Sequence, residues 1–138
     1  MIRSFEGEHR WLSNFWPVRV EIYGRWYPSV ENAYQAAKTV DVERRKQFET
    51  CTALQAKSLG KRLNMRSDWD RIKLDVMDAL CRQKFRQEPF RSQLLATDHQ
   101  EIQEGNWWGD RYWGVCKGTG LNHLGRIIMR IRTELREE

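Results

Sequence analysis

The stretch PVRVEIYGRWYPSVENAYQAAK, residues 17–38, changes its hydrophobic period once, and that change decides the fold class. Within it, Val18, Val20 and Ile22 alternate with the charged residues Arg19 and Glu21, which is the period of a half-buried strand. Gly24 then offers a turn before a second extended segment, Arg25 to Tyr27. Two short strands joined by a glycine-containing turn predict an antiparallel β-hairpin.

The second half of the same stretch, Ser29 to Lys38, predicts a helix with Ser29 as its N-cap. The inward stripe of this helix is expected to consist of Val30, Ala33 and Ala37. Glu31, Gln35 and Lys38 fall within about 60° of one another on a helix that turns ~100° per residue. Two interpretations of this polar edge stay open. It is either a solvated surface, where most helical charges lie, or a carboxylate and an amine that face a ligand.

Most of the remaining chain has a helical pattern. Helices are expected within residues 41–51, 52–63, 67–87 and 90–97, and a last helix closes the chain. Its expected buried face is Leu121, Leu124, Ile128, Ile131 and Leu135, with Arg126, Arg130 and Arg132 mostly outside. Residues 98–120 lack a regular period, and an irregular segment of this length in a small domain is more often functional than not.

The length and composition are those of one globular domain covering residues 1–138. No apolar run approaches the ~18 residues that a membrane span needs, and the first residues lack the apolar core of a secretory signal. The three cysteines are widely spaced, which predicts reduced thiols in a cytoplasmic protein.

Two totals are unusual, namely a net charge of +5 and a count of seven tryptophans. Arginine, which far outnumbers lysine here, forms forked bonds to phosphates, and tryptophan is a good platform for flat rings. The composition therefore favours a nucleotide-like or phosphorylated partner, or nucleic acid. The alternative is a basic surface that only confers solubility, with the tryptophans in the core.

The sequence gives little support for a metal site. No two of His9, His99 and His123 have the spacing of a zinc-binding pair, and no C-x-x-C pair occurs. We expect no protein-bound metal and no cofactor, and a single Mg²⁺ held by carboxylates and a phosphate stays open. The glycines of GTGLNHLG, residues 118–125, lack dinucleotide-motif spacing, so they either shape a turn or expose N–H groups to an anion.

The segment NWWGDRYWG, residues 106–114, combines an acid with aromatic rings. Asp110 lies among these rings, where a carboxylate is desolvated unless something pairs with it. Glu104, just upstream, is a second acid of this kind. For Trp107 and Trp108 we expect an aromatic clasp over the core.

A second polar and aromatic segment is WLSNF, residues 11–15. The hydroxyl of Ser13 and the amide of Asn14 suit hydrogen bonds to a ribose or a base. A simple turn leading into the hairpin explains the same residues, and from pattern alone it is the stronger interpretation.

Eight motifs, in order, resemble those of the NADAR or YbiA-like family. They are LSNFWP, YPSVENAYQAAK, AKSLGKRL, WDRIKLDVM, KFRQEP, LLATD, EGNWWGDRYWG and GTGLNHLGRIIMRIR, and they cover nearly the whole chain. Each motif is weak alone, but the ordered set is specific. The resemblance implies a helix-rich α+β fold in which an N-terminal β-hairpin packs on a bundle of about five to six helices.

The resemblance also implies hydrolysis of N-glycosidic bonds. YbiA-like members are associated with cleaving the C1′–N bond of phosphorylated ribosylamino-pyrimidine intermediates of riboflavin biosynthesis. Other members are associated with removing ADP-ribose from guanine, and a non-catalytic ADP-ribose or NAD-binding module is a further alternative. The implied partner is a small phosphorylated ribosylamine or ADP-ribosyl substrate, or a modified guanine in nucleic acid, without a membrane. We expect a monomer.

Carried over residue by residue, the resemblance assigns catalysis to Glu31, Lys38 and Asp110. It assigns substrate binding to Ser13, Asn14, Phe15, Trp69, Glu104, Trp113, Gly114 and Asn122. In the mechanism that these residues suggest, Glu31 is the general acid and base, and Asp110 orients sugar hydroxyls or raises the proton affinity of Lys38. Glu104 is a reserve candidate for these acid roles. Lys38 holds the ribose or phosphate, or forms a Schiff base with the ring-opened sugar.

Overall fold

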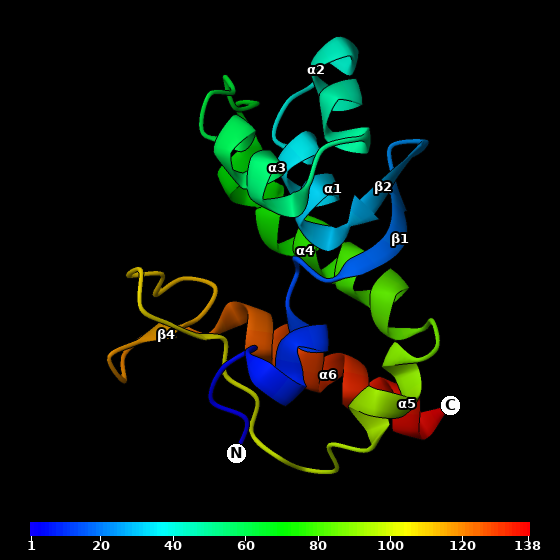
Figure 1. Ribbon diagram of the computed structural model, residues 1–138, viewed down its shortest axis with the longest axis vertical. Helices are drawn as coiled ribbons and strands as arrows, with labels where there is room; N and C mark the ends of the chain where they lie inside the picture. The colour runs from blue at the N-terminus through cyan, green and yellow to red at the C-terminus, as the bar shows by residue number, and fades with distance from the viewer. The chain divides into compact units, whose positions relative to one another are not determined.

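A computed structural model describes all 138 residues, and their contacts divide into two compact units. Unit 1 contains Met1–Ser13 and Phe85–Glu138, and unit 2 contains Asn14–Lys84. Figure 1 shows the elements of both units coloured along the chain. The prediction of a single domain over residues 1–138 stays a prediction.

The predicted hairpin is the first element of unit 2. Strands β1 (Pro17–Ile22) and β2 (Arg25–Ser29) pair antiparallel, as Figure 1 shows. Tyr23 and Gly24 between them have φ values of 53° and 78°. Two successive positive φ values define a type I′ turn, whose twist matches that of the flanking strands. The predicted hairpin is therefore confirmed, with its turn at the expected glycine.

The hairpin packs on helices of its own unit. Glu21 in β1 exchanges two hydrogen bonds with the side-chain amide of Gln83 in α4 (Trp69–Phe85). The Glu21 N–H donates to Gln83 Oε1 at 2.7 Å, and Gln83 Nε2 donates to Glu21 O at 2.6 Å. These bonds satisfy backbone groups of β1 that the hairpin pairing leaves unused.

Helix α1 (Val30–Ala37) follows the hairpin directly. The hydroxyl of Ser29 accepts the N–H of Asn32 at 3.0 Å, so the predicted N-cap is confirmed. All eight residues of α1 are buried, and the helix packs against the hairpin and α3 (Ala53–Gly60). Burial on every side excludes the solvated interpretation for Glu31 and Gln35, which are 8% and 5% exposed.

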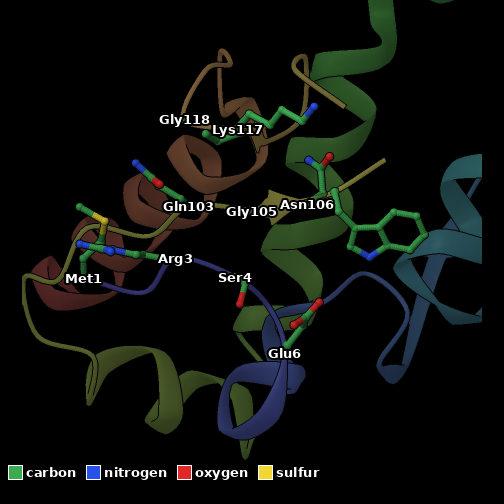
Figure 2. A pocket seen from close by; sticks show the side chains of 11 residues that line it. Met1, Arg3, Ser4, Glu6, Gln103, Gly105, Asn106, Lys117 and Gly118 are labelled. Atoms are coloured by element: carbon green, nitrogen blue, oxygen red, sulfur yellow. The ribbon is translucent and has the colours of Figure 1, made fainter. Parts of the chain in front are cut away.

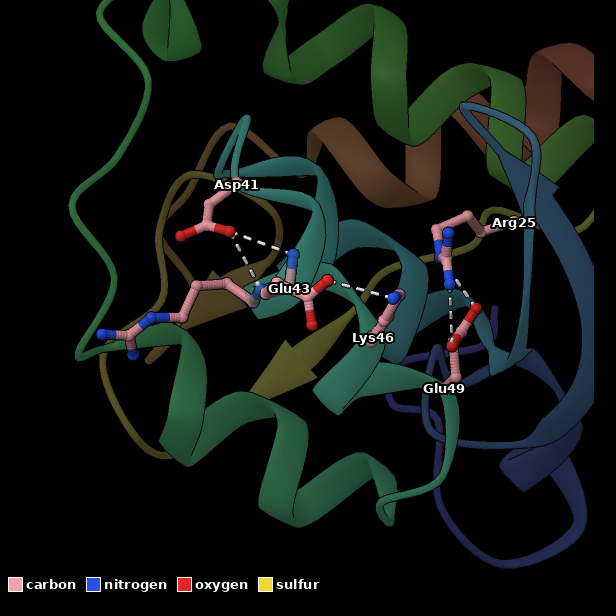
Figure 3. Close-up of polar contacts among 6 residues, drawn as sticks. Arg25, Asp41, Glu43, Lys46 and Glu49 are labelled. Carbon is pink, nitrogen blue, oxygen red and sulfur yellow. Dashed lines mark hydrogen bonds and ion pairs between the residues drawn. The ribbon is translucent and has the colours of Figure 1, made fainter.

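Polar contacts fix the short helices that follow α1, as Figure 3 shows. Asp41 caps α2 (Val42–Lys46) by accepting two backbone N–H groups at 3.0 and 3.3 Å. Glu49, at the end of the 3-10 helix η2 (Gln47–Glu49), pairs with Arg25 of β2 at 2.9 Å. At α3, Thr52 and Gln55 form a complete capping box.

Unit 1 contains the 3-10 helix η1 (Gly7–Leu12), α5 (Phe90–Leu95) and α6 (His123–Glu137). It also contains two two-residue parallel strands, β3 (Gly105–Asn106) and β4 (Val115–Cys116). These strands were not predicted, because two residues are too few to show a period.

Helix α6 confirms most of its predicted buried face but corrects two positions. Leu121 is exposed, because the helix begins only at His123. Arg132, expected outside, is buried, and its guanidinium donates to Thr97 Oγ1 at 2.9 Å. The aliphatic stem of an arginine packs among apolar neighbours when its charged head finds a partner.

The predicted fold class is confirmed, since six α-helices accompany one antiparallel hairpin. None of the helices has both the length and the apolar character that a membrane span requires. The three cysteines are free thiols.

Candidate active site

The carboxylate of Glu31 lies inside unit 2 and is held by its neighbour one helical turn away. Gln35 Nε2 donates to Glu31 Oε2 at 2.6 Å. The backbone N–H of Glu31 donates to Asn14 O at 3.0 Å, which joins the predicted Asn14 segment to the first turn of α1. A buried carboxylate that accepts a hydrogen bond has a fixed orientation, which general acid–base chemistry requires.

Gly60 is the reason that Gln35 reaches this position. A Cβ atom at residue 60 would lie 1.9 Å from Gln35 Oε1, which is far inside contact distance. Gln35 Oε1 itself is buried without a hydrogen-bond partner. The packing of α3 on α1 therefore sets the orientation of the Gln35 amide, and through it the orientation of Glu31.

Lys38 follows α1 as its C-cap and is half-buried. Its Nζ lies 5.4 Å from the centre of the Tyr34 ring, and Tyr34 packs on Trp69 with ring centres 5.1 Å apart. Burial lowers the pKa of Lys38, the Glu31 carboxylate opposes this change, and the charge of Lys73 adds to it. A lowered pKa increases the neutral fraction of the amine, which is its nucleophilic form.

Two arginines that the sequence analysis missed fix the chain around Lys38. The N–H of Arg66 donates to Lys38 O at 2.8 Å, and Arg45 Nε donates to Thr39 O at 2.8 Å. Both guanidinium groups lie over the ring of Tyr23, at 5.6 and 4.4 Å from its centre. Sequence patterns gave no signal for this cluster, because its members come from three separate segments.

A second group of predicted residues lies in unit 1 around Asn106. The Asn106 amide donates to Glu104 Oε2 at 3.0 Å and to Asp110 O at 2.8 Å, and it accepts the Asp110 N–H at 3.0 Å. A Cβ at Gly114 would lie 1.9 Å from Glu104 Oε2, so glycine leaves room for this acid. Asn106 was missed, although its place between two predicted acids was a usable signal.

The carboxylate of Asp110 caps a turn. Asp110 Oδ1 accepts the backbone N–H groups of Tyr112 and Trp113 at 3.1 and 2.9 Å. The half-buried ring of Trp113 packs against Tyr112, with ring centres 4.9 Å apart. Oδ1 of Asp110 is therefore used by the turn. A hydrogen bond from Asp110 to a sugar hydroxyl would have to use its second carboxylate oxygen, Oδ2.

Asn122 has a structural task in unit 1. Its side chain donates to Ile102 O at 2.9 Å and accepts the N–H of Glu104 at 3.0 Å. Its φ of 55° is a left-handed conformation that asparagine tolerates better than most residues. The Asn122 amide thus positions the backbone of Glu104, which is a scaffold role. The predicted contact of Asn122 with a substrate stays a prediction.

Two other predicted binding residues flank the start of unit 2. Ser13 is buried in unit 1, where its N–H donates to Arg10 O at 3.0 Å and closes η1. Phe15 is half-buried in unit 2.

The expected aromatic clasp is wrong. Trp107 is 80% exposed and Trp108 is 48% exposed, so neither ring covers the core. The next residue, Gly109, has a φ of 89°, a left-handed turn conformation that glycine adopts without strain.

Within each unit, the fold therefore gathers predicted residues. Unit 2 brings together Asn14, Glu31, Lys38 and Trp69, and unit 1 brings together Glu104, Asp110, Trp113, Gly114 and Asn122. Their roles toward a substrate stay predictions. No group of three or more His, Cys, Asp or Glu side chains is arranged to hold a metal ion.

The fold and these residues define a small α+β protein whose buried helix carries a carboxylate and an amine. The chain belongs to the NADAR domain family, whose model matches residues 3–136. The family resemblance in the sequence is confirmed by this match.

The names of similar proteins are consistent with this family assignment. The chain is 33% identical over 131 residues to the N-glycosidase YbiA of Escherichia coli, covering 90% of this chain and 80% of that protein. It is 40% identical over 134 residues to a riboflavin biosynthesis protein of Vibrio vulnificus, covering 94% of this chain but only 36% of the relative. The solved structure of E. coli YbiA matches with a TM-score of 0.85 and 28% identity, covering 99% of this chain and 83% of that one. The predicted enzyme class agrees with the names of these relatives.

Proposed function

We propose that this protein is an N-glycosidase that hydrolyses the C1′–N bond of phosphorylated ribosylamino-pyrimidine intermediates of riboflavin biosynthesis. The observation that carries the proposal is the buried Glu31 carboxylate, held at 2.6 Å by Gln35, on the helix that ends at Lys38. Relatives named as an N-glycosidase and as a riboflavin biosynthesis protein support the reaction and the substrate class.

In this reaction the oxygen of water bonds to C1′, and the exocyclic nitrogen leaves with the electrons of the broken bond. The nitrogen needs a proton to leave as a neutral amine, and the attacking water loses one. Glu31 donates the first proton and accepts the second, so it ends in its starting state. The products are the aminopyrimidine and ribose 5-phosphate. Glu31, once it has given up its proton, is itself a carboxylate whose negative charge stabilises the positive charge that develops at C1′.

Lys38 has two candidate roles in this proposal. As a cation it holds the ribose or its phosphate. As a neutral amine, which its lowered pKa favours, it attacks C1′ of the ring-opened sugar and displaces the aminopyrimidine. The resulting C1′=N bond is then hydrolysed by water, which releases the sugar and restores the amine.

The test uses Glu31→Gln and Lys38→Ala, with release of free base followed by chromatography. The matched controls are Glu43→Gln and Lys46→Ala, which remove the same groups from an exposed ion pair on α2. We expect a loss of at least about a hundredfold in the first two variants, the usual size of a general acid–base contribution, and little change in the controls. Activity within about tenfold of wild type in both site variants contradicts the roles of Glu31 and Lys38.

Two further arms identify the reaction. Incubation with ADP-ribosylated guanine in parallel tests the alternative substrate, and calorimetry with ADP-ribose tests binding without turnover. Borohydride added during turnover reduces a C1′=N bond to a stable amine, so a covalent adduct that is missing in Lys38→Ala supports the Schiff base. An active enzyme that yields no adduct leaves Lys38 with the cationic role.

We also propose a cytoplasmic monomer, in line with the three free thiols. Light scattering on the purified chain tests the monomer, and a mass of twice the 16.6 kDa of the chain contradicts it.

A further inference from the structure

The proposed substrate carries a phosphate, and unit 1 offers no group of basic side chains that converge on one. Unit 1 contains a hollow of about 550 Å³ whose basic side chains are Arg3 and Lys117. Figure 2 shows these two side chains extending to opposite ends of the hollow. A phosphate is held best where several donors meet at one point. Unit 2 contains a better candidate in Lys73 of α4.

Lys73 lies on the apolar face of α4. Trp69, Val76 and Leu80 mark this face, and all three are buried. Lys73 follows Trp69 by four residues and precedes Val76 by three, so it lies on the same side of the helix. The side chain of Lys73 is accordingly only 23% exposed. Its aliphatic stem therefore packs along the inner face of α4 and not along the solvent face.

One helical turn before Lys73, the face of α4 contacts the residues around Lys38. Trp69 packs on Tyr34 with ring centres 5.1 Å apart, and the Lys38 amine lies 5.4 Å from the centre of the Tyr34 ring. Burial is the main cause of the lowered pKa of Lys38, and the charge of Lys73 lowers this pKa further. Both observations place the two lysines in the same part of unit 2.

One helical turn after Lys73, the same face contacts the segment that holds Glu31. Met77 Sδ accepts a hydrogen bond from Asn14 Nδ2 at 3.5 Å. Asn14 O in turn accepts the backbone N–H of Glu31 at 3.0 Å. Lys73 thus stands between two contacts of α4, one leading to the candidate amine and the other to the candidate acid.

The ammonium of Lys73 reaches the solvent edge of this region. Its Nζ lies 3.2 Å from Asp70 Oδ1, and the Asp70 side chain is 91% exposed. An exposed ion pair of this kind contributes little to stability. A phosphate carries more charge and more acceptor oxygens than a carboxylate, so it can replace Asp70 as the partner of Lys73.

We propose that Lys73 binds the 5′-phosphate of the substrate, which leaves Lys38 free to act at C1′. This assignment rests on the proposed function, the hydrolysis of a phosphorylated ribosylamine. An amine that bonds to C1′ cannot hold the phosphate at the same time, because the sugar separates the two groups. The two roles considered for Lys38 are therefore divided between two lysines. Lys73 determines the specificity for a phosphorylated sugar, and Lys38 takes part in breaking the bond.

Calorimetry with ribose 5-phosphate and ribose tests the assignment without turnover. We expect ribose 5-phosphate to bind more tightly than ribose. Lys73→Met should weaken the binding of ribose 5-phosphate about tenfold or more, the size of one hydrogen bond to a charged group, and Lys73→Arg should retain most of it. The matched control is Arg71→Gln, which removes a positive charge from the exposed side of α4 and should leave the affinity unchanged.

Asp70→Asn separates a phosphate contact from a packing role of Lys73. The phosphate then no longer displaces a carboxylate, so ribose 5-phosphate should bind about twofold more tightly or better, the size of one exposed ion pair on a helix. Asp75→Asn removes the same charge from another exposed position of α4 and is the control. Equal effects of the two changes contradict a phosphate at Lys73. The assignment is also overturned if ribose 5-phosphate does not bind, or if Lys73→Met binds it like the wild type.

Steady-state kinetics then separates this assignment from the proposed function. The substrates are the phosphorylated ribosylaminopyrimidine and its dephosphorylated form, compared by kcat/KM. We expect Lys73→Met to lose most of the wild-type preference for the phosphorylated form. An active Lys73→Met enzyme that keeps this preference overturns the role of Lys73 and leaves the proposed hydrolysis standing. A wild type that cleaves neither substrate, but binds ribose 5-phosphate through Lys73, overturns the hydrolysis and supports the phosphate site.

Discussion

Gln35 Nε2 lies 2.6 Å from Glu31 Oε2, and the Gln35 amide in turn fits against Gly60 of α3. A buried acid is therefore held by a residue whose own position depends on the absence of a side chain on a neighbouring helix. A hydrogen bond to a charged group contributes about 1.5–3 kcal/mol. If the Gln35 amide is displaced, the Glu31 carboxylate loses this stabilisation and its fixed orientation. This chain of contacts makes Gln35 and Gly60 positioning residues for Glu31.

The first prediction concerns Gly60→Ala. The new methyl group displaces the end of a flexible side chain, and alanine in a helix is favoured over glycine by about 1 kcal/mol, so the free energy of unfolding should change by no more than that. The Gln35 amide can no longer hold Glu31, so kcat should fall about tenfold or more. Urea unfolding and steady-state kinetics measure the two effects separately.

The control for this prediction is Gln35→Leu, which removes the same amide directly. If both changes act through one contact, the double variant should lose no more activity than Gln35→Leu alone. Independent losses that multiply in the double variant argue against the proposed link from Gly60 to Glu31.

The second prediction separates the charge of Asp110 from its turn. In Asp110→Asn the side-chain oxygen still accepts the two backbone N–H groups of Tyr112 and Trp113, so the melting temperature should stay near that of wild type. If the charge takes part in catalysis, kcat falls about a hundredfold. Asp110→Ala should lower both kcat and the melting temperature. A fully active Asp110→Asn assigns this residue to the turn alone.

The third prediction concerns the scaffold role of Asn122. Asn122→Ala leaves Ile102 O and the Glu104 N–H without their partner, at a cost of about 1–3 kcal/mol for each buried group. Asn122→Gly loses the same bonds but accepts the φ of 55° freely, so it should be about 1 kcal/mol more stable than the alanine variant. Urea unfolding compares them, and equal stability of wild type and Asn122→Ala contradicts the role.

The sequence predicted those parts of the fold that depend on local signals. The hairpin turn at Gly24 and the N-cap at Ser29 are set by residues close to one another, and both are where the pattern placed them. The start of α6 and the burial of Arg132 were misjudged. The apolar spacing of the helix already includes Leu121, which lies before the first helical residue, His123. The partner of Arg132, Thr97, lies on a distant segment, so the sequence pattern does not show it.

The candidate site was predicted in its residue types but not in its supports. The acid and amine of α1 were identified, yet their burial follows from packing against α3 and the hairpin, which a helical period does not show. Asn106 and Gly60 were missed as supports, because one acts through a loop and the other through the side chain that it lacks. The exposure of Trp107 was not predicted, because tryptophan side chains are usually largely buried.

The last prediction concerns the dependence of stability on pH at Lys38. Burial lowers the pKa of Lys38 from its ordinary value of 10.5, so the folded chain binds this proton less tightly than the unfolded chain. Between the two pKa values the unfolded state carries more protons, and the free energy of unfolding therefore rises with pH in this window. Below the folded pKa the full cost of burying the charge is present. Lys38→Met removes the charge and keeps the length of the side chain, so it should be more stable than wild type at neutral pH. This advantage should shrink as the pH rises toward 10.5.

Urea unfolding of both proteins across this range measures the difference, and Lys46→Met on exposed α2 controls for general effects of high pH. An advantage of Lys38→Met that is absent at neutral pH, or that stays constant with pH, means that the Lys38 amine is not held in a desolvated position.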